Sequence, residues 1–199
     1  QPFEPNWNSE SNLKEIYDQI QKRLELYVDA WNVLDDIDNR CIVLEPFVGD
    51  KSAPRAAMAR RIALGQHRTL SLVVDWQRPF RMPSECRVFG PESAVAILRQ
   101  TLSNNSNQWD NKRSIVDNFQ TLFGFELPSK SLNSRSEFAI ECGICRNYRF
   151  EDTLAIPENV CENARCGTPY HHPCLYQWLA SNPSNRRVFA TIYGNCCYC

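Results

Sequence analysis

The first strong pattern along the chain is an apolar stripe with helical spacing over residues 13–36. Apolar residues recur every three or four positions, which places them on one face of an α-helix. They are Leu13, Ile16, Ile20, Leu24, Tyr27, Trp31 and Leu34. Asn12 and Glu15 have the spacing of a capping box and predict the start of this helix. The stripe either packs in the core of its own domain or stays exposed as a docking surface, and the pattern allows both.

Residues 41–127 mix strand-like and helix-like patterns, which predicts an α+β domain. Short apolar runs bounded by turn residues predict strands over 42–47, 57–64, 69–75 and 86–89. Pro91 is expected at the first position of a helix that ends near residue 102, before a Ser/Asn-rich loop. A second short helix is expected over 114–122. Its inward residues would be Ile115, Phe119 and Leu122.

The Ser-rich polar stretch 128–140 predicts a linker. The expected organisation is therefore a long helix and an α+β domain over 1–127, the linker 128–140, and a small domain over 141–199.

Composition narrows the class of protein. The 199 residues are 43% hydrophobic, enough to bury a core in one or two domains. A net charge of −1 gives no sign of a nucleic-acid surface, and no apolar run approaches the roughly 20 residues that span a bilayer. We therefore expect neither a direct nucleic-acid partner nor a membrane. The chain begins at Gln1 without a Met or a signal-peptide pattern, so we expect a piece of a longer protein.

The most specific chemistry is a ladder of eight potential metal ligands in residues 141–199. It reads Cys142-x2-Cys145-x15-Cys161-x4-Cys166-x4-His171-x2-Cys174-x21-Cys196-x2-Cys199. Thiolate and imidazole ligands in fours predict two tetrahedral zinc sites. Since protein side chains supply all eight ligands, the two Zn²⁺ ions are expected to be structural rather than catalytic. A disulfide framework would not need the His in this ladder.

Two residues next to the ligands, Cys197 and His172, test the assignment. Cys197 does not fit the two-residue spacing between the last ligands, and His172 adjoins His171 but breaks the spacing to Cys174. Cys41 and Cys86 stand alone in apolar stretches and are expected to be buried.

Two apolar residues of the small domain are candidates for contact with another protein. Ile144 lies inside the first Cys-x2-Cys, and Trp178 follows Cys174 by one helical turn. Side chains of this kind often anchor a protein partner. Trp178 could equally fill the small core of its own domain.

The ligand ladder, with Cys-x-Ile-Cys at its start and Trp178 after the sixth ligand, resembles a RING finger. In that family the first ligand pair joins the fifth and sixth ligands, and the third and fourth join the last pair. The resemblance therefore implies one site of Cys142, Cys145, His171 and Cys174. It implies a second site of Cys161, Cys166, Cys196 and Cys199. The family's surface for a ubiquitin-conjugating enzyme maps onto Ile144 and Trp178, with Arg146 and Cys197 beside the second and seventh ligands.

Longer motifs resemble the Fanconi anaemia ubiquitin ligases, the L subunit of the Fanconi core complex. They are Cys142-Gly-Ile-Cys145, Cys166-Gly-x-Pro-Tyr-His171, Cys174-Leu-Tyr-x-Trp178-Leu179, Ile192-Tyr-Gly-x-Cys196, Leu44-Glu45-Pro46, the run 59–65 and the Pro-x3-Pro of 79–83. This resemblance implies a domain related to ubiquitin-conjugating enzymes and RWD domains before a RING. It implies transfer of ubiquitin without a covalent intermediate, and a nuclear role in DNA crosslink repair.

The same resemblance implies the partners. They would be a charged conjugating enzyme, ubiquitin, other core-complex subunits and, as substrates, the D-group and I-group Fanconi proteins, which become monoubiquitinated. Val88 and Phe89 on the last strand are candidate substrate contacts, although core packing would explain each of them as well.

Two other classes share part of the pattern. A PHD-type reader of histone tails has the same ligand order, and a purely structural zinc lobe would bury Ile144 and Trp178 against another domain. No lysine follows Lys130, so the small domain offers no lysine to a ubiquitin that it helps to transfer.

Overall fold

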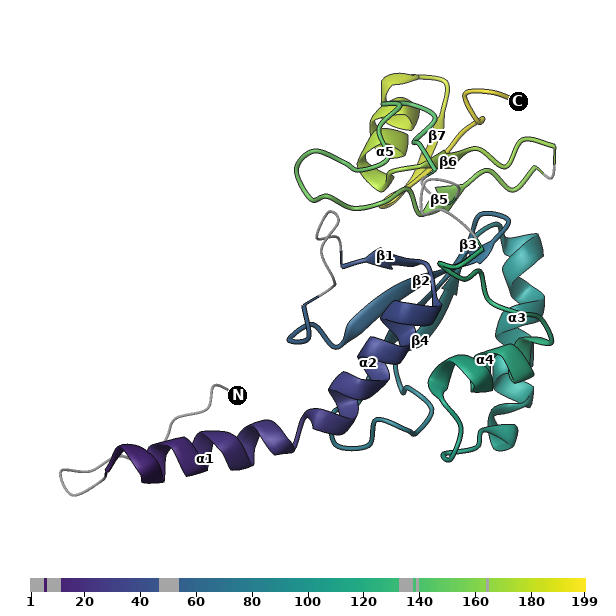
Figure 1. The fold of residues 1–199 in the computed structure, drawn as a ribbon. Helices are drawn as coiled ribbons and strands as arrows, with labels where there is room; N and C mark the ends of the chain where they lie inside the picture. Colours follow the sequence, from purple (N-terminus) through teal and green to yellow (C-terminus); the bar gives the residue numbers. More distant parts are fainter. Residues whose placement is uncertain (1–5, 7–11, 47–53, 133–137, 139, 164) are drawn as a thin grey trace.

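The computed structural model describes residues 6, 12–46, 54–132, 138, 140–163 and 165–199. The N-terminal part contains α1 (Leu13–Glu25), α2 (Val28–Arg40), β1 (Val43–Glu45), β2 (Ala59–Gly65), β3 (Arg68–Val73), β4 (Cys86–Phe89), α3 (Glu92–Asn104), a 3-10 turn (Ser106–Gln108) and α4 (Ile115–Phe123). The C-terminal part contains β5 (Asn159–Val160), β6 (Pro169–Tyr170), α5 (His172–Ser181), β7 (Arg186–Val188) and β8 (Thr191–Tyr193). The two parts lie against each other (Figure 1).

The apolar stripe of residues 13–36 forms two helices, so the prediction of one long helix is wrong. The predicted capping box at Asn12 and Glu15 is confirmed and begins α1. The break falls at Leu26 and Tyr27. The Tyr27 ring stacks on Trp31 and lies 4.9 Å from the ring centroid of Trp76, so this aromatic group holds the start of α2 against the body of the domain.

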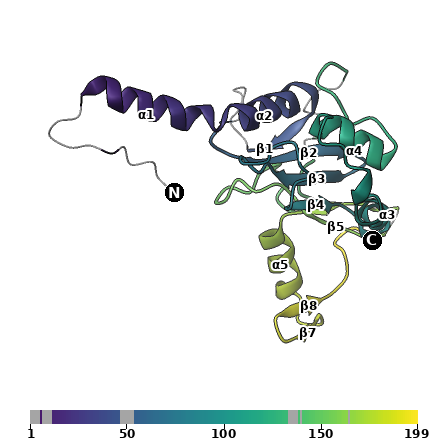
Figure 2. The same cartoon turned by 90° about the horizontal axis from the view of Figure 1, so that it is seen from below.

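The pattern left open whether the stripe packs in the core or stays exposed. The first half of the stripe is exposed and the second half packs in the core. Helix α1 contains no buried residue and projects away from the sheet in two perpendicular views (Figures 1 and 2). Helix α2 instead packs Ala30, Val33, Leu34 and Ile37 into the core.

This difference predicts unequal effects of the same substitution. Leu34→Ala removes a fully buried side chain and is expected to lower the free energy of unfolding by about 2–5 kcal/mol. Leu13→Ala acts on a side chain that is 80% exposed and is expected to change it by no more than about 0.5 kcal/mol. Thermal unfolding followed by circular dichroism measures both. Equal losses would mean that α1 is covered in solution.

The sheet is an antiparallel meander in the order β1-β2-β3-β4. Its register aligns Val43, Ile62, Leu70 and Val88 in one row across all four strands. All four are buried in the main core. This core is completed by apolar residues of α2, α3 and α4, which cover that face of the sheet.

The four predicted strands are confirmed. Most of their ends differ from the predicted ends by one or two residues. The strand expected over 42–47 is shorter, and Phe47 lies outside the described residues. Strand β2 carries buried residues at five successive positions, Arg60 to Leu64, which means that both of its faces are covered.

The buried Arg60 of β2 faces the helices and pairs with Asp38 of α2. Its Nε donates to Oδ1 of Asp38 at 2.7 Å, and its Nη2 donates to Oδ2 at 2.9 Å. The remaining Nη1 donates to the carbonyl oxygens of Ala57 and Ala59. A buried guanidinium is tolerated because each nitrogen has an acceptor.

The two predicted helices of the α+β region are present. Pro91 caps α3 rather than occupying its first turn, and the helix runs on to Asn104 before the 3-10 turn. Helix α4 begins after Ser114, whose hydroxyl accepts from the backbone N–H of Asp117, and ends at Gly124 in the left-handed region with φ 74°. The predicted inward residues of α4 are all buried. They are Ile115, Phe119 and Leu122.

The stretch predicted as a linker is tied down at both described ends. Ser129 bridges to Cys41, and the Nζ of Lys130 donates to the carbonyl oxygen of Asp38. Phe138 packs against a small cluster shared by the two parts of the chain. The stretch therefore does not behave as a free spacer over these residues, while 133–137 and 139 lie outside the described residues.

The C-terminal part contains two short hairpins and one helix. Strands β5 and β6 pair antiparallel, as do β7 and β8. Helix α5 begins at His172, and Pro173 fits the first turn of a helix. None of the described helices is both long and apolar enough to pass through a lipid bilayer.

Candidate metal centres and partner surface

The structure gathers the eight ladder residues into two groups of four. The first group is Cys142, Cys145, His171 and Cys174. The second is Cys161, Cys166, Cys196 and Cys199. The potential ligand atoms in each group lie within 4.8 Å of one another. The groups interleave along the chain, as the resemblance to RING fingers implies.

The first group has the spacing of a tetrahedral site. The Nδ1 of His171 lies 3.3 Å from Sγ of Cys145 and 3.8 Å from Sγ of Cys174. Zn–S bonds of about 2.3 Å place ligand atoms at tetrahedral corners about 3.8 Å apart. The donor set and its spacing therefore fit one zinc ion.

The imidazole of His171 is oriented by a contact on its far side. It is 1% exposed, and its Nε2 lies 3.3 Å from the backbone carbonyl oxygen of Tyr148. With Nδ1 facing the thiols, Nε2–H donates to this carbonyl, which is the usual outer contact of a metal-binding histidine. His172 is exposed and belongs to neither group.

Backbone amides prepare Cys142 for metal binding. Burial raises the pKa of this thiol, but backbone N–H donors from Cys145, His171 and Ile144 outweigh burial and lower the pKa. The N–H of His171 lies 3.4 Å from its Sγ. These donors stabilise the thiolate, the form that binds metal.

The second group also fits a tetrahedron and is more exposed. Sγ of Cys166 lies 3.8 Å from Sγ of Cys196, and Sγ of Cys161 lies 3.6 Å from Sγ of Cys199. Cys161 and Cys166 lie between β5 and β6, and His171 follows β6 directly. This hairpin therefore places the first two cysteines of the second group between the two halves of the first group along the chain. The chain returns to the second group after α5 and the β7–β8 hairpin.

Tyr170 is a buried contact of the second group. Its hydroxyl lies 2.9 Å from Sγ of Cys196 and 3.3 Å from Sγ of Cys197. Partial burial raises the pKa of the Cys196 thiol, but hydrogen bonds, led by the one from Tyr170, lower it to about 6. Cys197 stays outside both groups, as the spacing predicts.

The residues of the predicted partner surface lie on the loop of Cys142 and Cys145, on the loop of Cys196 and Cys199, and on helix α5. Ile144 is half-buried against the first group, whereas Trp178 on α5 is 45% exposed. Arg146 is exposed with φ 63°, and its guanidinium lies 5.7 Å from the ring centroid of Tyr198. The Tyr198 hydroxyl donates to the carbonyl oxygen of Gly143 at 2.8 Å.

This hydrogen bond joins the loop of Cys142 to the loop of Cys199, although the two loops serve different metal groups. Gly143 is required at this contact, because a Cβ would lie 2.5 Å from Thr168 and 2.9 Å from Tyr170. Sequence reasoning missed Tyr170, Tyr198 and Gly143. The only signal was their position beside or between ligands.

The candidate substrate contacts on β4 do not form an exposed patch. Val88 is 3% exposed and packs in the main core. Phe89 is half-buried beneath the Arg61 guanidinium, 4.4 Å from the ring centroid, where the two parts of the chain meet. The role of Val88 and Phe89 in substrate binding stays a prediction.

A four-stranded antiparallel domain with flanking helices, followed by a cross-brace finger with two groups of four ligands, defines the class: a UBC-like domain joined to a RING-type finger. Comparison with family models gives the same division. Residues 29–130 match "FANCL UBC-like domain 3", and residues 138–199 match "FANCL C-terminal domain". The chain therefore belongs to the FANCL family.

Individual relatives agree with this assignment. The chain is 36% identical over 198 residues to mouse "E3 ubiquitin-protein ligase FANCL". The aligned region covers 100% of this chain and 51% of the mouse protein. It is 27% identical over 198 residues to "E3 ubiquitin-protein ligase Fancl" of Drosophila melanogaster, covering 96% and 51%. The solved "Crystal Structure of FANCL" superposes with a TM-score of 0.64 at 28% identity, covering 87% of this chain and 46% of that one. The chain thus spans about half the length of the curated relatives it matches.

Proposed function

We propose that this chain is the part of a RING-type ubiquitin ligase that recruits a ubiquitin-charged conjugating enzyme and directs its ubiquitin to a lysine. The observation that carries this proposal is the pair of interleaved ligand groups, which hold the loop of Ile144 and Arg146, on a finger whose helix α5 carries the exposed Trp178. Two zinc ions would hold these loops, in the two groups whose geometry fits them. Each group of four leaves no ligand position for substrate, so the zinc ions would be structural.

The remaining cysteines favour direct transfer rather than a ubiquitin thioester on this chain. Burial raises the pKa of Cys41 to about 12 and that of Cys86 to about 12, so neither is a thiolate at neutral pH. Cys197 lies against the Tyr170 hydroxyl. Catalysis would therefore come from holding the charged enzyme and the acceptor lysine close together.

Family membership supports the finer parts of the proposal. We infer that the acceptors are the D-group and I-group Fanconi proteins, that other subunits of the Fanconi core complex assemble with this ligase, and that it acts in the nucleus in crosslink repair. Val88 and Phe89 remain the candidate substrate contacts on the UBC-like domain, although Val88 is buried in the main core and Phe89 is half-buried.

A discharge assay tests the ligase activity. The purified chain is mixed with ubiquitin-charged conjugating enzymes of several types and free lysine, and loss of the thioester is followed in time. Trp178→Ala is expected to slow discharge by about 30-fold, because a central anchor residue is typically worth at least about 2 kcal/mol of binding. Ile144→Ala is expected to act in the same direction.

Tyr176→Ala is the matched control. Tyr176 is also exposed on α5, but two residues of helix place it on a different side from Trp178. Equal losses in both variants, or no discharge with any conjugating enzyme by a chain that holds two zinc ions, would contradict the proposal and favour a binding finger of the PHD type or a structural lobe.

A further inference from the structure

The finger covers the face of the sheet that the helices leave open. On this side of β1 and β2 lie Ile42, Leu44 and Ala63, all buried. They form one cluster with Ile156 of the finger, against which Phe138 and Tyr148 also pack. We call this contact the joint. It explains why β2 is buried on both faces, with the main core beneath one and the finger above the other.

A buried arginine of the sheet reaches across the joint. The side chain of Arg61 is 5% exposed, and its Nη1 donates to Glu158 of the finger. Its Nε donates to the Thr69 hydroxyl at 2.9 Å, and its guanidinium covers the Phe89 ring. The finger therefore supplies Glu158 as a counter-ion to a desolvated charge whose other polar partners lie in the sheet.

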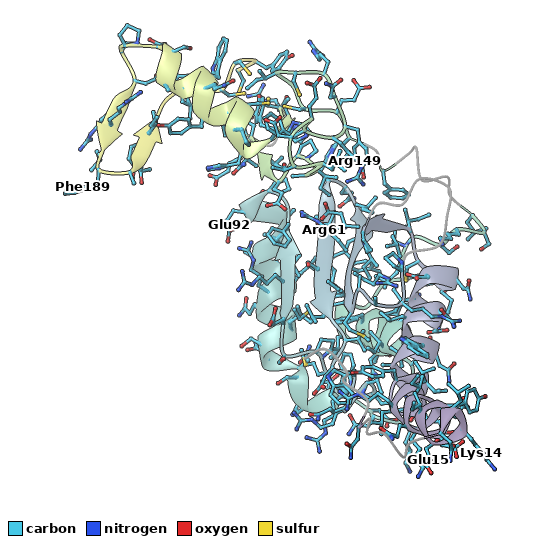
Figure 3. The ribbon with its side chains drawn as sticks, turned by 90° about the vertical axis from the view of Figure 1, so that its left-hand side faces the viewer. Lys14, Glu15, Arg61, Glu92, Arg149 and Phe189 are labelled. Atoms are coloured by element: carbon cyan, nitrogen blue, oxygen red, sulfur yellow. The ribbon has the colours of Figure 1, made fainter. Side chains whose placement is uncertain are left out.

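A second arginine reaches back from the finger to the sheet. Nη2 of Arg149 donates to the carbonyl oxygen of Leu44 at 2.8 Å. Its Nη1 lies 3.8 Å from Glu45, and Nη1 of Arg61 lies 3.7 Å from the same carboxylate. The two arginines lie together where finger and sheet meet (Figure 3). Arg61 donates from the sheet to the finger, and Arg149 donates from the finger to the sheet. Because hydrogen bonds are directional, these two contacts fix the orientation of the finger on the sheet, which apolar packing alone would not.

The lysines of the chain all lie on one side of the joint, so the orientation of the finger affects which of them ubiquitin can reach. Every lysine of the chain lies in residues 1–130, at positions 14, 22, 51, 112 and 130. Ubiquitin held by the finger must therefore cross the joint to reach any lysine of this chain, and equally to reach a substrate held by the UBC-like domain.

We propose that the joint fixes the finger on the UBC-like domain and thereby selects which lysine receives ubiquitin. This inference rests on the proposed ligase function. Arg61 and Glu158 are positioning residues, since neither would touch the reacting thioester. Freeing the finger should leave its intrinsic activity intact and widen the set of lysines that it reaches.

The orientation is tested first without any activity. Glu158→Arg places a second cation against Arg61 and is expected to open the joint, because Glu158 is half-exposed and the substitution does not enter a core. In ¹⁵N relaxation of the native chain, finger and UBC-like domain should share one rotational correlation time. In the variant the finger should tumble faster by roughly 1.5-fold or more, as a tethered small domain does. A single correlation time in both proteins would overturn the proposal.

Two further variants keep this test decisive. Glu151→Arg makes the same charge change at an exposed finger position outside the contacts of the joint and should behave like the native chain. Glu158→Gln removes the charge without adding repulsion, and it decides the question if Glu158→Arg fails to retain two zinc ions.

The selection of lysines is then read from the discharge assay. Glu158→Arg and Glu151→Arg are expected to discharge ubiquitin to free lysine within about twofold of the native chain, since neither lies on the Ile144 and Trp178 surface. Mass spectrometry of self-modified chains should show additional lysines only for Glu158→Arg. An unchanged set of modified lysines, including none in either protein, would overturn the proposal. Failure of the native chain to discharge any conjugating enzyme would instead count against the ligase function, and the relaxation result would still decide the joint.

Discussion

Removing metal from the finger is expected to unfold residues 141–199 while the UBC-like domain stays folded. The finger buries little beyond its ligands, with Cys142, Tyr170 and Cys174 as its fully buried centre. A core this small does not hold a fold alone, and structural zinc in small zinc peptides contributes about 10–16 kcal/mol per site. The UBC-like domain keeps its main core, which comes from its own helices and strands.

Native mass spectrometry should show two zinc ions on the intact chain, and a chelator should release both. Amide spectra should then lose the dispersed signals of the finger and keep those of the UBC-like domain, at a lower melting temperature because the joint is lost. Cys196→Ser should lose one zinc, whereas the adjacent Cys197→Ser should retain both, since Cys197 lies outside the ligand groups. Retention of a folded finger without metal would contradict a structural role for zinc.

The second large effect is expected from Arg60. Arg60→Leu removes the partner of Asp38, a carboxylate that is 9% exposed, and breaking a buried pair from one side costs about 3–5 kcal/mol. Total stabilities of about 5–15 kcal/mol make this a severe loss. Urea unfolding measures it.

Arg55 provides the matched control, because it also pairs with a carboxylate of α2, Asp35, but on the surface. Arg55→Leu should leave the unfolding midpoint nearly unchanged. The double variant Arg60→Leu with Asp38→Leu should recover much of the loss, since no uncompensated charge remains. A double variant as unstable as the single one would mean that Arg60 acts through packing rather than through its charge.

Local patterns predicted the elements whose causes are local. The capping box at Asn12 gave a correct helix start, and the apolar run over 69–75 gave strand β3, in which Leu70 and Leu72 are buried. The break at Leu26 and Tyr27 was not predictable, because the periodicity continues through it. It depends on the contact of Tyr27 with Trp76, about 50 residues away.

The sequence predicted which residues form the metal groups, but it did not predict the residues and strands that position them. Spacing alone identified eight ligands and left Cys197 out, but two-residue strands such as β5 and β6 carry no periodic signal. The joint was also invisible in the sequence. Arg61 and Ala63 look like ordinary strand residues, and only the tertiary fold shows that a second layer covers them.

The double-sided burial of β2 also bears on how the chain can be cut into smaller pieces. A fragment that stops near residue 130 would leave Ile42, Leu44 and Ala63 facing water, together with a guanidinium that has lost its main counter-ion. Exposed sheet surface of this kind promotes self-association. A shortened version for crystallisation or ligand screening is thus expected to behave better when those three positions are made polar, or when the finger is kept as its natural cover.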